Sequence, residues 1–164
     1  MRRIYLTGEI NTKAYRSLSR KLFSAREANE DVDLILNSVG GSPYDAMAIY
    51  DLITASKEII QIDTIATGLV ASAATLVLAA GTKRYMTANA WVMVHEDTTD
   101  VVEDDKVSDI ERKVAHGRRL ENQWNELLAK HTKLRADEWT LVNKTETYLT
   151  ALECQAYGLI DEVI

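Results

Sequence analysis

A serine and a histidine follow one another in two apolar stretches of the chain. Ser72 lies within the small and apolar segment 68–81, and His95 directly follows the apolar run Trp91–Val94. Serine is a weak nucleophile at neutral pH, so it needs a base that takes its proton and donors that stabilise the oxyanion that forms. These residues therefore predict a site at which Ser72 and His95 are presented to each other for nucleophilic catalysis.

Strand-like and helix-like segments alternate around this pair. Short apolar runs predict strands at 4–6, 34–36, 62–66 and 91–94, with a final strand over 159–160 and 163–164. Helical spacing predicts helices over about 12–29 with Thr12 as its cap, from Pro43 onward, around Ser72, over about 109–131 and over 151–157. This order is typical of a layered α/β domain.

Two details of these segments bear on packing and turns. The run Leu34–Leu36 is uninterrupted, which is typical of a strand covered on both faces. Gly40 and Gly41 follow it and permit a sharp turn, while Pro43 suits the first position of a helix.

Composition limits the classes of protein that fit this chain. Its 164 residues, 46% of them hydrophobic, suit one globular domain over 1–164. The net charge of −6 argues against a nucleic-acid partner. Cys154 has no second cysteine to pair with, and no signal-peptide core opens the chain, so we expect a cytoplasmic protein. No apolar run reaches the roughly 18 residues that a membrane helix needs, so no membrane association is expected.

No metal or cofactor is expected either. His95-Glu96 lacks the second histidine of a zinc-binding helix, and the sequence has no phosphate-binding loop.

Five separated motifs resemble those of the proteolytic subunits of the Clp protease (ClpP), in the same order. They are Ser38–Ser42, Ala46–Asp51, Gly68–Gly81 with its Ala71-Ser72 pair, Val92–His95 and Tyr157–Asp161. Together they span nearly the whole chain and are far more specific than a glycine pair alone. The resemblance implies a ClpP/crotonase-like ββα spiral, an α/β fold with a protruding handle helix in the region of about 96–132. It also implies a serine endopeptidase that hydrolyses peptides or unfolded polypeptides inside a ring-shaped homo-oligomer.

The resemblance also assigns roles to individual residues. Ser72 resembles the family's nucleophile and His95 its general base. The two main-chain donors of the oxyanion hole fall on Gly41 and Ala73. Gly40 and Ser42 fall in the segment that binds the substrate.

The third member of the triad departs from the family in residue type. Matching 148–153 to the family segment places Glu146 where the family usually has aspartate. Glutamate can orient the imidazole in other serine hydrolases, although its extra methylene demands a different backbone position or rotamer. Asp97, two residues after His95, is the alternative acid, but it is poorly placed to reach the far side of that ring. A simple solvated charge is the competing interpretation of Glu146.

Other departures from the family concern assembly. The chain starts almost at its first strand, so we expect it to lack the N-terminal arm with which the family contacts an ATP-driven unfoldase, and such a partner is in question. Pro43 and Val39 alter the segment that binds substrate. The acidic run 96–105 falls where the family's rings meet, so like charges favour one ring, or two stacked rings that depend on salt or pH.

Two other classes of protein stay open. One is a catalytically inactive structural ring subunit, which the departure from aspartate at position 146 favours. The other is a crotonase-like acyl-CoA enzyme, which shares the spiral but does not need Ser72 or His95.

Overall fold

The computed structural model describes residues 1–96, 102 and 106–164. Within these residues the chain forms seven strands and six helices in the order β1 (Arg2–Ile10), α1 (Thr12–Glu27), β2 (Val32–Gly41), α2 (Pro43–Ser56), β3 (Ile62–Ala71), α3 (Ala74–Ala79), β4 (Arg84–Met86), β5 (Trp91–Val94), α4 (Val107–Ala129), α5 (Ala136–Asn143), β6 (Thr147–Leu149), α6 (Ala151–Tyr157) and β7 (Glu162–Val163). This alternation confirms the predicted α/β class.

The sheet divides along β3. The order β1-β2-β3-β4-β7 is parallel throughout, and β5 also pairs in parallel with β3. Residues 64–66 of β3 pair with β4, whereas 69–71 pair with β5. Gly68, with φ of +57°, lies between the two halves. The second half of β3 still pairs with β2 through Val70 and Ser38, but on its other side it pairs with β5 in place of β4, and β3 and β5 end close together.

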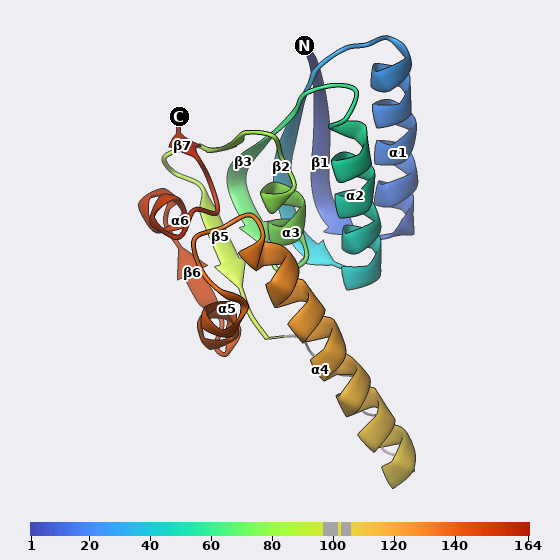
Figure 1. Cartoon of the computed structure of the whole chain (residues 1–164), viewed down its shortest axis with the longest axis vertical. Coiled ribbons are helices and arrows are strands. Elements are labelled where there is room, and N and C mark those ends of the chain that lie inside the picture. Colours follow the sequence, from blue (N-terminus) through green and yellow to red (C-terminus); the bar gives the residue numbers. More distant parts are fainter. Residues whose placement is uncertain (97–101, 103–105) are drawn as a thin grey trace.

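Helices α1 and α2 lie side by side along β1 and β2 (Figure 1). They bury apolar stripes that include Leu18, Leu22, Ile49 and Ile53. On β2, Leu34 and Leu36 are fully buried but Ile35 is only partly buried. The prediction that this run is covered on both faces is therefore wrong, because the face that carries Ile35 is only partly covered in the described part of the chain.

Helix α4 is the protruding handle, and its first half extends away from the body of the molecule (Figure 1). All of its buried residues, Leu120, Asn125 and Leu128, lie in the second half. Val107 at its start is 73% exposed. At about 1.5 Å per residue the helix is about 34 Å long, so its first half cannot pack on the same core as its second half.

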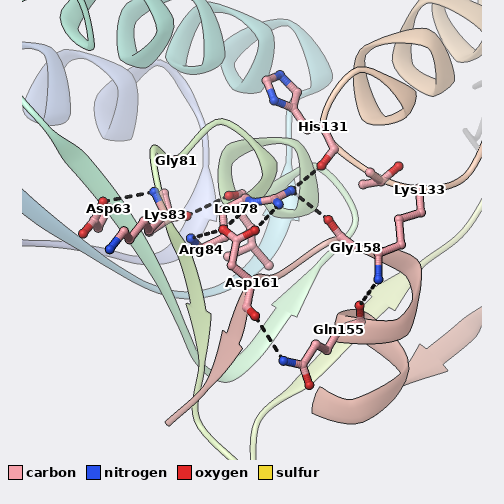
Figure 2. A network of polar contacts seen from close by, with 12 residues as sticks. Asp63, Leu78, Gly81, Lys83, Arg84, His131, Lys133, Gln155, Gly158 and Asp161 are labelled. Atoms are coloured by element: carbon pink, nitrogen blue, oxygen red, sulfur yellow. Dashed lines mark hydrogen bonds and ion pairs between the residues drawn. The ribbon is translucent and has the colours of Figure 1, made fainter.

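Arg84 fixes the end of α4 against the sheet (Figure 2). Its guanidinium donates to both carboxylate oxygens of Asp161, at 2.5 and 3.0 Å, and to the carbonyl of Gly158 at 2.8 Å. It also donates to the carbonyl of His131, just beyond α4. This clamp joins β4, the segment before β7 and the end of the handle, and it thereby holds the buried half of α4 in place.

Some boundaries differ from those predicted. Asn11, not Thr12, caps α1, because its side chain accepts from the N–H groups of residues 13 and 14 at 3.1 Å. Residues 159–160 are buried but belong to no strand, and β7 covers only Glu162–Val163. Helix α5 and strands β4 and β6 were not predicted. In the part of the chain that the structure describes, no helix is both long and apolar enough to cross a membrane.

Candidate active site

Ser72 occupies a strained turn between β3 and α3. Its φ of +52° lies in the left-handed region, which residues other than glycine rarely adopt. The turn is held by the N–H and hydroxyl of Thr75, which donate to the carbonyl of Ser72 at 3.0 and 2.7 Å. Strain of this kind gathers at functional sites, where the surrounding structure compensates for it.

The pairing of β3 with β5 brings His95 to this turn. Ala71 is opposite Met93, and the N–H of Ser72 donates to the carbonyl of Met93 at 2.8 Å. His95 follows two residues later, and its Nε2 lies 2.8 Å from the hydroxyl oxygen of Ser72. The sheet register therefore places the two side chains at hydrogen-bonding distance.

The contact of the other ring nitrogen of His95 determines which of the two nitrogens carries the proton in the neutral ring. Nδ1 lies 2.5 Å from the main-chain carbonyl oxygen of Glu96. A carbonyl oxygen can only accept, so the neutral ring carries its proton on Nδ1 and presents the lone pair of Nε2 to the Ser72 hydroxyl. This is the tautomer that a general base needs.

The glycine turn at the end of β2 lies directly against Ser72. A Cβ on Gly40, whose φ is +89°, would lie 2.6 Å from the carbonyl oxygen of Ala71 and 2.8 Å from the Cβ of Ser72. The N–H of Gly40 donates to the hydroxyl of Ser38 at 3.1 Å, which itself donates to the carbonyl of Gly8. Only glycine at position 40 allows this close approach.

A pocket opens beside the Ser-His pair, and four of the predicted site residues line it. These are Gly41, Ser72, Ala73 and His95. Ser42 has a different role in this structure, since its hydroxyl caps α2 by accepting from the N–H of Asp45 at 3.2 Å. Its assignment to substrate binding stays a prediction.

Glu146 lies near His95 in the sheet register but contacts another side chain. Strand β6 runs antiparallel to β5 with Thr147 opposite Val94, so Glu146 is the next residue opposite His95. Its exposed carboxylate accepts from the hydroxyl of Tyr148 at 2.7 Å, and this hydrogen bond raises the pKa of Tyr148. Asp97 lies outside the described residues. The role of Glu146 as third member of the triad therefore stays a prediction.

The far wall of the pocket was missed from the sequence. It comes from α4 and α5, which contribute Leu120, Trp124 and Asn143. Leu120 and Trp124 belong to the apolar stripe of α4, which predicts burial but not a pocket. Nothing in the local pattern marked Asn143, because α5 itself was not predicted. Among residues 1–96, 102 and 106–164, no cluster of three or more histidine, cysteine or acidic side chains is arranged to hold a metal ion.

The fold is α/β, and the site pairs a serine hydroxyl with a histidine ring in the tautomer that can accept its proton. The chain belongs to the Clp protease family, since the family model described as Clp protease matches residues 1–164. This confirms the resemblance on which the residue roles were based.

Three curated relatives have similar sequence identity to this chain. The chain is 36% identical over 139 residues to an "ATP-dependent Clp protease proteolytic subunit 2" of Corynebacterium jeikeium (strain K411), covering 84% of this chain and 65% of that protein. It is 36% identical over 145 residues to "subunit 1" of Bifidobacterium longum (strain NCC 2705), covering 87% and 61%. It is 35% identical over 140 residues to "subunit 1" of Thermobifida fusca (strain YX), covering 84% and 62%. The alignments thus cover less than two thirds of the length of these relatives.

Proposed function

We propose that this protein is a serine endopeptidase that cleaves peptides or unfolded polypeptides through an acyl-enzyme on Ser72. The observation that carries the proposal is the 2.8 Å contact between Ser72 and a His95 ring whose tautomer is set by the Glu96 carbonyl. A crotonase-like enzyme would not need this pair. The names of the curated relatives support the same activity.

The proposed reaction uses these groups in sequence. The Ser72 oxygen attacks the scissile carbonyl carbon while Nε2 of His95 takes the hydroxyl proton. The oxyanion of the tetrahedral intermediate accepts hydrogen bonds from the N–H groups of Gly41 and Ala73. The imidazolium then gives its proton to the leaving amine, and water hydrolyses the acyl-enzyme by the same steps.

In this proposal Glu146 stabilises the imidazolium that forms during attack. Because it is next in register opposite His95, a change of rotamer away from Tyr148 is the movement that this role requires. The Glu96 carbonyl already orients the ring but carries no full negative charge. The two groups would therefore divide the work that one aspartate performs in the template triad.

The assembly that we propose is a homo-oligomer of one or two stacked rings. The exposed first half of α4 supports it, because a helix that extends from the body with its Val107 and Val114 accessible is suited to contacts between subunits. The acidic run 96–105 lies almost entirely outside the described residues, so its effect on ring stacking stays a prediction. An ATP-driven unfoldase partner stays in question for this chain.

Reaction of the protein with a fluorophosphonate, followed by mass spectrometry of the labelled peptide, tests the function. We expect label on Ser72 and cleavage of short unstructured peptides without ATP. Ser72→Ala should lower kcat by roughly 10⁶-fold, as loss of a triad nucleophile does elsewhere. Ser24→Ala, at an exposed serine of α1, is the matched control and should keep both properties. Wild-type protein that neither reacts nor cleaves would instead favour a structural ring subunit.

A further inference from the structure

The hydroxyl of Tyr148 binds the carboxylate that the proposed triad needs. Tyr148 lies in β6, and its hydroxyl donates to Oε1 of Glu146 at 2.7 Å. This hydrogen bond, followed by the negative charge of Glu146, raises the pKa of Tyr148, so the hydroxyl keeps its proton and remains a donor at neutral pH. The carboxylate of Glu146 is therefore turned along its own segment of chain, toward β6.

Strand register places Glu146 and His95 on the same face of the β5–β6 pair. The two strands are antiparallel, with Tyr148 opposite Met93, so continuing this register by two residues places Glu146 opposite His95. Side chains two residues apart on a strand share a face, and so do directly opposite side chains. Opposite residues have Cβ atoms about 4.5–5.5 Å apart, a distance that a glutamate side chain can span.

The ring of His95 has a neutral partner in place of this acid. In the template triad the Nδ1–H group donates to a carboxylate, which stabilises the imidazolium. Here Nδ1 lies 2.5 Å from the main-chain carbonyl oxygen of Glu96. A neutral carbonyl fixes the tautomer of the ring, but a hydrogen bond to a carboxylate is roughly twice as strong. In this structure the base is therefore paired with a neutral acceptor, and the acid with a phenol hydroxyl.

We propose that Tyr148 is a positioning residue that keeps Glu146 away from His95, so that loss of its hydroxyl makes the protein a faster peptidase. This inference rests on the proposed peptidase function and on Glu146 as the acid of the triad. Without the hydroxyl, the carboxylate is released from β6 and turns across to the imidazolium that forms opposite it. The change concerns the chemical step, so kcat should respond and KM should not.

Tyr148→Phe tests the proposal because it removes only the hydroxyl. The Tyr148 ring lines an exposed apolar hollow together with Leu69 and Trp91, so phenylalanine leaves an apolar ring at this place. We expect kcat for a short fluorogenic peptide to rise on the order of 10-fold at unchanged KM, because a hydrogen bond to a charged group can shift a two-state equilibrium by about that factor. Tyr5→Phe, at an exposed tyrosine of β1, is the matched control and should leave kcat unchanged.

Two further measurements distinguish this role from a merely structural one. The acid limb of the pH dependence of kcat/KM should move to higher pH in Tyr148→Phe, because a carboxylate beside the ring favours its protonated form. In the Glu146→Gln background, Tyr148→Phe should change neither kcat nor this pH profile. Melting temperatures of all variants report whether each one folds.

Labelling of Ser72 by a fluorophosphonate is measured in parallel and shows whether each variant keeps a working nucleophile. An unchanged or lower kcat in a labelled Tyr148→Phe variant would overturn the role of Tyr148 while leaving the peptidase function intact. A rise in kcat that persists in the Glu146→Gln background would overturn it as well, since the effect would not pass through Glu146. A wild-type protein that is neither labelled nor active would overturn the peptidase function, and this inference with it.

Discussion

Replacement of Gly40 by alanine should lower kcat by more than its effect on folding stability explains. The added Cβ would lie 2.6 Å from the Ala71 carbonyl, 2.8 Å from the Ser72 Cβ and 2.9 Å from the Ala73 nitrogen, and contacts under 3.0 Å are essentially never seen. The backbone of 71–73 must therefore move by about 0.4 Å or more. Since a misplacement of about 1 Å can cost about 10²-fold in rate, we expect kcat to fall by about 10- to 100-fold.

Gly8→Ala is the matched control for this experiment. Gly8 also has a left-handed φ, +76°, but a Cβ there would meet nothing within 4 Å. Both variants should lose about 1–2 kcal/mol from the left-handed backbone alone. Peptide turnover, Ser72 labelling and the denaturation midpoint would be measured for each. If Gly40→Ala retained the kcat of Gly8→Ala at similar stability, the argument that Gly40 positions Ser72 would be refuted.

Three further predictions concern single titratable groups. Glu146→Gln should cut kcat strongly, by up to roughly 10⁴-fold if the carboxylate alone supports the imidazolium, without changing the melting temperature; a larger loss in Asp97→Asn than in Glu146→Gln would show that the acid is misassigned. Burial, followed by the nearby Lys57 and Arg84, lowers the pKa of His131, so the unfolded chain binds its proton more readily. Stability should therefore be complete above about pH 6.5 and decline as the pH falls below it, and urea titrations of His131→Gln should show a flatter pH profile. Burial raises the pKa of Cys154 to about 12, so alkylation by iodoacetamide at pH 8 should be slow in the folded protein and rapid in denaturant; equal rates would contradict its burial.

Local patterns in the sequence predicted most of the elements. The 3.6-residue spacing of α1 and α4 and the apolar runs of β3 and β5 are properties of short segments, so they can be recognised without knowing what those segments pack against. The motifs around Ser72 and His95 also identified the two residues that the structure brings within 2.8 Å. Errors arose where neighbours far along the chain decide the outcome, as at Ile35, which the described residues leave only partly buried.

The sequence by itself determined the class of fold and the family and singled out Ser72 and His95, because residue type and spacing carry that information. Only the tertiary structure decided how these groups are oriented. The division of β3 between β4 and β5 sets the approach of His95 to Ser72, and the Glu96 carbonyl selects its tautomer. The same is true of the exposed Glu146, whose carboxylate contacts Tyr148, and of Asn143, which α5 brings to the pocket and which donates a hydrogen bond to Asn125 of α4. Each depends on strand register or on contacts between distant segments, which the local sequence does not encode.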